Sequence, residues 1–233
     1  MTNFLGAQPY DHVGAQSEIR PLIRGVYAWM TVGLLVTAFV AYLVSSSPTL
    51  LALALNPAVV IVAIIVELVL VFVLSGAINR LSAGMAMLMF LVYAALNGFT
   101  LSLIFITYNI GTLTLAFFTT AATFAAMTLI AFTTDIDLSR YSTYFMMGLI
   151  GLMIALVVNI FLQSSGLDFI LSIVGVLLFS ALTAYDTQRI QQLAAGSDDN
   201  TLTQMSIRGA LALYLDVINL FFSFLRIFDR RQR

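Results

Sequence analysis

The 233-residue sequence contains no cysteine and a single histidine, and all ten of its basic residues are arginine. Without cysteine, disulfides, thiolate catalysis and cysteine-ligated metal sites are excluded. The one histidine, His12, lies in a polar N-terminal segment, which leaves no candidate for a histidine-based catalytic triad or metal site. The sequence also lacks a GxSxG motif and a phosphate-binding loop. We therefore expect no enzyme activity and no cofactor.

Charge is scarce as well, because only 9% of the residues are charged, while 61% are hydrophobic and the mean hydropathy is +1.02. A soluble domain has about 25% charged residues. The apolar residues form runs of roughly 20, the length with which a helix crosses about 30 Å of hydrocarbon, rather than the short alternating segments of a membrane barrel. The sequence therefore predicts an all-α integral membrane protein.

The apolar runs predict seven transmembrane helices, at residues 25–45, 57–79, 82–107, 112–132, 143–163, 167–192 and 206–228. The polar breaks between them are too short to hold a second folded domain. We expect a polar N-terminal tail over 1–24, one seven-helix domain over 25–228 and a short C-terminal tail over 229–233. The tail lacks the basic start and small-residue cleavage site of a signal peptide, so we expect the first helix to be retained.

The arginines predict the orientation of the chain. Six lie in the N-terminal tail or in the loops on its side of the membrane: Arg20, Arg24, Arg80, Arg140, Arg189 and Arg208. The loops on the other side have none, so the positive-inside rule predicts a cytoplasmic N-terminus. Seven crossings place the C-terminal arginines outside, which the same rule disfavours. A re-entrant last segment is the alternative, but residues 206–228 are long enough to span.

Three acidic residues, Glu67, Asp186 and Asp216, fall inside predicted helices, whereas the other eight lie in tails or loops. An ionised acid near the centre of the bilayer costs about 2.5–3.5 kcal/mol on insertion scales. Such residues are expected to face protein or a water-filled cavity. They are the candidate functional residues of the sequence.

Two of these acids belong to polar helix faces. In the last helix, polar residues three or four positions apart form one stripe: Asp216, Asn219, Ser223 and Arg226. In the sixth helix, the same spacing gives a second polar face: Ser180, Thr183, Asp186 and Thr187. A short loop joins the two helices, so the stripes can meet. We expect Asp186 and Asp216 to be neighbours in the inner half of the membrane.

Two facing carboxylates in a low dielectric cannot both ionise cheaply, so the pair would share a proton and titrate as a unit, which makes a pH switch. When ionised, Asp186 and Asp216 offer oxygen ligands and two negative charges to a divalent cation such as calcium. Because calcium takes six to eight oxygens, the pair would bind it weakly and exchangeably, as permeation requires. The alternative is that both acids only stabilise helix packing, a contribution of about 1–2 kcal/mol.

The second helix and its neighbour supply further candidates. Glu67 has no polar residue one turn further along, so its partner must lie on another helix. It either lines the outer half of the same path or is a protonated acid hydrogen-bonded to a neighbour. Arg80 either anchors its helix at the membrane surface or pairs with the carboxylates. Asn97 shares a face with Tyr93 and Thr100, and these residues serve either packing or the pore.

An intramembrane aspartyl protease also uses two acids on adjacent helices. Its second acid stands in a glycine-rich GxGD sequence, whereas the strings here are "AYDTQ" and "LYLDVINLF". The protease interpretation is therefore disfavoured.

The strings "LTAYDTQRI" and "GALALYLDVINLFFSFLRIF", separated by a short polar loop, resemble the paired C-terminal signature of the transmembrane Bax inhibitor motif (Bax inhibitor-1-like) family, specifically of its bacterial members. The resemblance covers almost the whole chain, including "VYAWMTVGLLVTAFVAY" and "LSAGM". It implies seven helices with the last at the centre. Glu67 matches an acid in the family's second helix, and Arg80 matches a family arginine only approximately.

The resemblance also implies a function. The matching family aspartates gate a pH-sensitive calcium leak in the bacterial inner membrane, which assigns that role to Asp186 and Asp216 and predicts that protonation favours opening. Other family members instead regulate or bind membrane proteins, including proteases and cell-death factors, and this is the alternative. The expected partners are the lipid bilayer, calcium ions and other membrane proteins, without nucleic acid.

Overall fold

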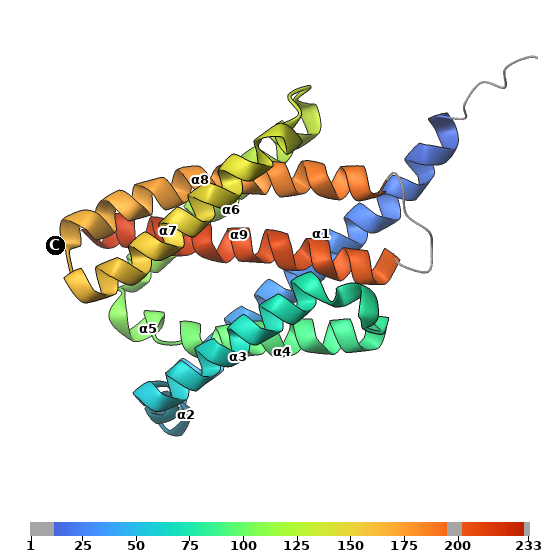
Figure 1. Cartoon of the computed structure of the whole chain (residues 1–233). Coiled ribbons are helices and arrows are strands. Elements are labelled where there is room, and N and C mark those ends of the chain that lie inside the picture. Colours follow the sequence, from blue (N-terminus) through green and yellow to red (C-terminus); the bar gives the residue numbers. More distant parts are fainter. Residues whose placement is uncertain (1–11, 195–201, 231–233) are drawn as a thin grey trace, which may run out of the picture.

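The computed structural model describes residues 12–194 and 202–230, with side chains for 21–78, 80–193 and 202–230. Every regular element in these residues is helical (Figure 1). In chain order, the α-helices and the two 3-10 helices (η) are α1 His12–Ser46, α2 Pro48–Ala54, α3 Pro57–Gly76, η1 Ile78–Arg80, α4 Ala83–Leu101, α5 Ile104–Thr107, α6 Ile110–Thr133, η2 Leu138–Tyr141, α7 Ser142–Leu162, α8 Ser165–Ala194 and α9 Leu202–Arg230.

Seven stretches within the described residues are long and apolar enough to cross a membrane: Pro21–Ser46, Pro57–Gly76, Ala83–Thr107, Ile110–Thr133, Leu138–Leu162, Ser165–Leu193 and Leu202–Arg230. They coincide with the seven predicted helices to within a few residues. The last is one continuous helix of 29 residues rather than a re-entrant segment. The prediction of an all-α protein with seven membrane helices is confirmed.

The two ends of the bundle differ from the predicted boundaries. Helix α1 begins at His12, so residues 12–24 of the predicted polar tail are helical, and Pro21 lies inside the helix. Residues 1–11 and 231–233 of the two predicted tails lie outside the described residues.

The break predicted between the first two spans holds a short helix, α2. Pro48 occupies its first turn, where the missing N–H costs nothing, and the Ser47 hydroxyl accepts a hydrogen bond from the Leu50 N–H at 3.5 Å. Helix α3 starts in the same way, with Asn56 as its cap and Pro57 after it. Sequence periodicity missed α2 because its seven residues are too few to show a helical period.

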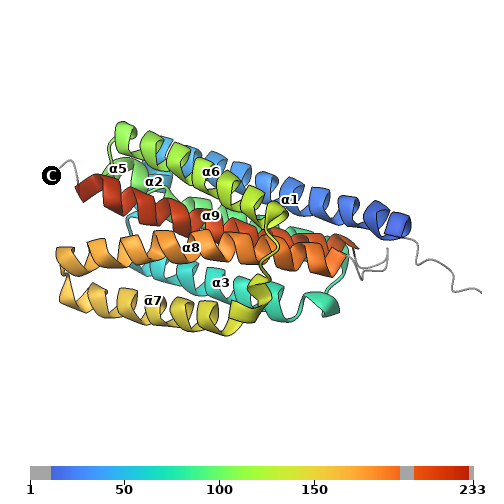
Figure 2. The same ribbon diagram turned by 90° about the horizontal axis from the view of Figure 1, so that it is seen from above.

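Helix α9 lies at the centre of the bundle and packs against α1, α3, α4, α6 and α8. Figure 2 shows it between α1 and α6 on one side and α8 on the other. Its side chains are accordingly the most deeply buried, and Leu213, Tyr214 and Leu220 are fully enclosed. By contrast, α3 and α7 expose large apolar side chains around most of their surface, as lipid-facing helices do.

One glycine fixes the contact between α1 and α4. A Cβ atom on Gly98 would lie 2.5 Å from the backbone oxygen of Thr37, so only glycine permits this approach. Small residues give membrane helices their packing energy, since lipid tails are as apolar as the helices themselves. The close contact holds Thr37 beside the central helix.

Candidate functional site

Asp186 on α8 and Asp216 on α9 lie close enough inside the bundle for their carboxyl groups to interact electrostatically. The two helices pack together along their length, and the charge of Asp186 acts directly on the Asp216 carboxyl. Asp216 is only 4% exposed and lies midway along α9. Asp186 is half-buried, and its carboxyl interacts electrostatically with Arg189, one turn further along α8. The structure thus brings together the two acids that the sequence predicted as neighbours.

Asp216 lacks the partners that would make it a simple packing residue. Its Oδ2 atom is buried and has no hydrogen-bond partner among the described residues. A buried carboxylate that only joined two helices would be expected to direct both oxygens at donors, because an unsatisfied polar atom costs about 1–3 kcal/mol. The carboxylate therefore keeps an oxygen available for a proton or a cation.

Further buried polar atoms without described partners lie on the elements that surround Asp216. On α8 they are the Thr187 hydroxyl and, one turn later, the Gln191 amide nitrogen, and on α1 the Tyr27 hydroxyl. Thr187 and Gln191 lead from the depth of Asp186 toward the end of α8. Such a succession of polar groups can bind water between the acid pair and the side of the membrane where α8 ends, and the Thr187 hydroxyl oxygen can also contact a cation.

Next along the α9 stripe, Asn219 is half-buried and Ser223 is buried, and both side chains form hydrogen bonds within α9. Asn219 donates its side-chain Nδ2–H to the Leu215 carbonyl at 2.8 Å, and Ser223 donates its hydroxyl to the Asn219 carbonyl at 2.8 Å. Ser223 also packs against Gly175 of α8. The prediction that this stripe avoids lipid is confirmed, while Asn219 points its amide hydrogens along α9 rather than into a path.

At the far end of the stripe, Arg226 pairs with Asp168 at the start of α8, with 4.0 Å between Nη1 and Oδ1. Both side chains are partly exposed, so the pair contributes little stability. It lies near the ends of α8 and α9 that are remote from Asp186. Asp168 is one of the eight acids that the sequence placed in tails or loops, and its position in the first turn of α8 agrees with a site near the end of a span.

Glu67 belongs to a separate polar cluster between α3 and α4. Its carboxylate accepts a hydrogen bond from the Thr100 hydroxyl at 3.0 Å and a long one from the Asn97 amide at 3.5 Å. Its charge also acts on the hydroxyls of Tyr93 and Tyr214. Of the two predicted roles for Glu67, the structure supports the acid hydrogen-bonded to a neighbouring helix. Thr100 is its closer partner, and Asn97 is the more distant one.

Tyr214 joins this cluster to α1. Its hydroxyl lies 2.6 Å from the Thr37 hydroxyl, which also lies 2.8 Å from the Ala94 carbonyl of α4. The ring packs edge-on against Tyr93 and Phe90. These contacts fasten α9 to α1 and α4, on the side of α9 that faces away from α8.

Arg80 lies in η1 at the membrane surface and is exposed. The structure gives it no ion pair with any described carboxylate, so the predicted pairing with the acid pair is not found, because the acids are buried between other helices. In the described part of the chain, no group of three or more His, Cys, Asp or Glu side chains could hold a metal. Asp186 and Asp216 would thus supply only part of a calcium shell.

Sequence reasoning missed Gln191, Tyr27 and the Thr37–Tyr214 hydrogen bond. Gln191 stands four residues after Thr187, a spacing that places it on the polar face of α8, but its position beside a polar loop made it look like a surface residue. The pairing of Thr37 with Tyr214 joins positions 177 residues apart and leaves no local signal.

The fold and the intramembrane acids define the class: a polytopic helical membrane protein with one acid on its central helix, α9, and a second acid close to it on α8. The family model "Inhibitor of apoptosis-promoting Bax1" matches residues 19–233. The chain therefore belongs to this Bax inhibitor-1-like family, as its C-terminal strings had indicated.

The chain is also similar along almost its whole length to bacterial membrane proteins. It is 44% identical to the inner membrane protein YbhL of Escherichia coli K12 over 224 residues, which cover 94% of this chain and 96% of that protein. It is 41% identical to an uncharacterized protein of Borreliella burgdorferi, with 89% and 90% coverage. An uncharacterized membrane protein of Streptococcus pyogenes is 39% identical, with 94% and 98% coverage.

Proposed function

We propose that the protein is a calcium leak channel whose conductance is set by protonation of the Asp186–Asp216 pair. One observation carries the proposal: Asp216 lies buried midway along the central helix, near a second acid, and one of its oxygens has no hydrogen-bond partner among the described residues. Placing an acid there costs several kcal/mol in a membrane, and a structural role is served more cheaply by asparagine. A role in binding protons and cations accounts for both carboxylates.

Conduction would follow the polar side chains of α8. A cation entering where α8 ends would meet Gln191 and Thr187 before it reaches the two carboxylates, which replace part of its hydration shell. Two acids and a hydroxyl do not complete the six to eight oxygens of a calcium site, so water supplies the rest and the ion exchanges readily. The step is binding and release, without covalent chemistry or a cofactor.

The charge of the pair would set the flux. With both acids ionised, two negative charges hold a divalent ion strongly, and the charge of Arg189 acts against those of the pair. Uptake of one proton removes half of that charge and lets the ion leave faster. We therefore expect flux to rise from pH 8 to pH 6, in the direction that the family resemblance also implies.

The similarity to an inner membrane protein supports a bacterial inner membrane location. The arginines of the N-terminal side support a cytoplasmic N-terminus, which places the end of α8 and its polar side chains at the cytoplasmic face. The partners would then be lipid and calcium.

The second candidate function is a membrane regulator that binds other membrane proteins, and the family description, an inhibitor of an apoptosis-promoting protein, favours it. Calcium flux into proteoliposomes that enclose a calcium indicator separates the two. The channel predicts protein-dependent flux that increases from pH 8 to pH 6. Flux equal to that of empty liposomes, with protein that unfolds cooperatively and elutes as one species, would contradict the channel and support the regulator.

A further inference from the structure

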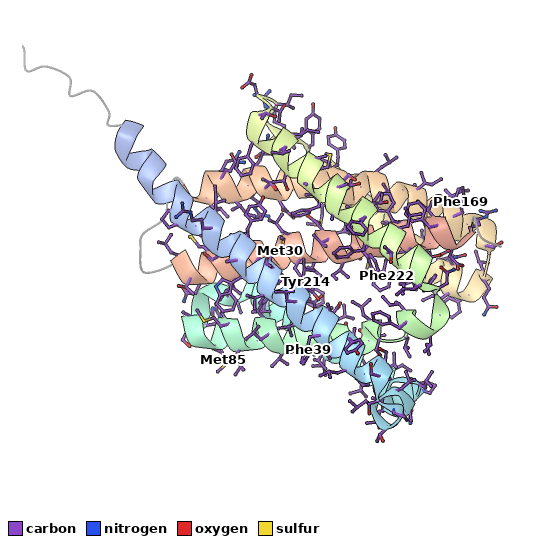
Figure 3. The ribbon with its side chains drawn as sticks, turned by 180° about the vertical axis from the view of Figure 1, so that it is seen from behind. Met30, Phe39, Met85, Phe169, Tyr214 and Phe222 are labelled. Atoms are coloured by element: carbon purple, nitrogen blue, oxygen red, sulfur yellow. The ribbon has the colours of Figure 1, made fainter. Side chains whose placement is uncertain are left out.

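A cavity of about 650 Å³ lies between α1, α6 and α9, with the end of α4 and the short helix α5 adding to its wall, and neither acid of the pair lines it. Its walls include Met30 and Ala38 of α1, Phe117 and Ala121 of α6, and Ile218 of α9. In Figure 3, α1 and α6 lie in front of α9, and the labelled Met30 stands near Tyr214 of the central helix. The volume falls within the roughly 300–1,000 Å³ of sites that hold small molecules.

The walls are apolar apart from three threonines. Thr37 directs its hydroxyl to Tyr214 and Ala94, and Thr114 directs its hydroxyl to the Ile110 carbonyl, so both offer the cavity mainly methyl groups. The Thr120 hydroxyl is buried without a described partner, and it can turn to the carbonyl one helical turn earlier. An apolar occupant fits such walls, and water does not.

The cavity opens sideways toward lipid. At its rim, Phe117 is 61% exposed and Phe118 is 65% exposed, whereas Ile218 at its base is 8% exposed. Helices α1 and α6 both pack on α9 and meet each other through the rings of Tyr27 and Phe124, 6.5 Å apart, close to one end of the cavity. The space between these two helices is therefore a lateral entry, with α9 as its rear wall.

The height of the cavity matches one leaflet of the membrane. On α1 the wall runs from Met30 to Ala41, a rise of about 16 Å at 1.5 Å per residue. Half of a hydrocarbon core of about 30 Å is about 15 Å. The wall also includes Leu113 near the start of α6, and α1 ends and α6 begins on the same side of the bundle, so the cavity belongs to the leaflet on that side.

From these features we propose that the cavity binds one acyl chain of a phospholipid from this leaflet, entering between α1 and α6. Lipid tails surround the rim, and a single chain has the apolar chemistry and the length that the cavity requires. Packing against the walls supplies the affinity, because transfer from bulk lipid gives no hydrophobic gain. The acyl chain would lie against Val217 and Ile218, which directly follow Asp216 on the central helix.

The test is photo-crosslinking in vesicles of phosphatidylcholine and phosphatidylglycerol that contain a phospholipid with a diazirine along one acyl chain. Mass spectrometry of the digested protein locates the adducts. Lipid at the outer surface labels α1 and α6 whether or not the cavity is filled, so the informative adducts are those on Val217, Ile218 and Phe221. The proposal predicts adducts on these residues in the native protein.

Ala121→Phe fills the cavity, and Ala122→Phe adds the same ring to an exposed neighbouring position that does not line it. We expect Ala121→Phe to reduce the α9 adducts several-fold and Ala122→Phe to leave them unchanged. Native protein that is labelled on α1 and α6 but not on α9 would overturn the proposal, as would equal α9 labelling in both variants. If Ala121→Phe does not fold, the presence or absence of α9 adducts in the native protein still tests the proposal.

Discussion

Tyr214 and Asp216 stand two residues apart on α9 and serve opposite sides of it: the tyrosine hydroxyl lies 2.6 Å from Thr37 on α1, while the aspartate faces Asp186 on α8. Two residues correspond to about 200° around a helix, so a single turn of the central helix joins both polar clusters. The Tyr214 side is hydrogen-bonded to its neighbours, whereas on the Asp216 side one carboxyl oxygen has no partner in the described part of the chain. The first side holds α9 in place, and the second is the candidate switch.

If Asp186 and Asp216 share a proton, infrared difference spectra between pH 8 and pH 6 should contain a protonated-carboxyl band that both acids determine. Replacement of either acid by asparagine should shift or remove this band. A change in Asp186→Asn alone would show that the acids titrate independently. Glu67→Gln identifies any contribution from the third buried acid.

Asp216→Asn should stabilise the protein at pH 8, because it removes a buried charge whose oxygen has no described partner. The expected gain is about 1–3 kcal/mol, measured as unfolding free energy in detergent. Asp168→Asn is the matched control, and loss of its partly exposed ion pair should cost less than about 1 kcal/mol. A lower stability of Asp216→Asn would identify Asp216 as a structural residue.

Glu67→Gln should leave the pH response of calcium flux unchanged. Glu67 lies in the cluster between α3 and α4, with Thr100 as its hydrogen-bond donor, and not beside the acid pair. A pH series of flux in proteoliposomes measures the effect. Loss of the response in this variant would mean that Glu67 and the pair act as one titrating unit.

Gly98→Ala should destabilise the protein by about 1–3 kcal/mol, since the added Cβ would lie 2.5 Å from the Thr37 carbonyl and push α1 away from α4. Thr37 would then lose its position beside Tyr214. Gly151→Ala is the control, because nothing lies within 4 Å of the added atom and helix propensity favours alanine by about 1 kcal/mol. Equal stability of the two variants, measured by thermal unfolding, would contradict the close contact.

The spans and the acid pair were predictable because each leaves a local signal. Apolar runs of about 20 residues are typical of membrane-spanning helices, and an acid within such a run requires a polar environment. The three- and four-residue spacing in α9 then indicated which face carries Asp216. The contact between α8 and α9 was also predictable, because consecutive helices joined by a short loop are usually neighbours.

What could not be predicted depends on contacts between distant parts of the chain. Glu67 has its partners on α4, and the sequence offered no way to choose between a path and a hydrogen bond. The cavity between α1 and α6 arises from how two non-consecutive helices rest on α9. Arg80 shows the reverse case, because its charge at the end of the second predicted helix allowed a pairing with the acids that the described residues do not contain.

The most direct test of the switch is the pH dependence of calcium flux from pH 8 to pH 6 in proteoliposomes that hold Asp186→Asn, Asp216→Asn or the control Asp168→Asn. We expect native protein and Asp168→Asn to conduct more at pH 6 than at pH 8, whereas both pair variants lose this difference. A pH response that persists in both pair variants would contradict the assignment of the switch to these two carboxylates.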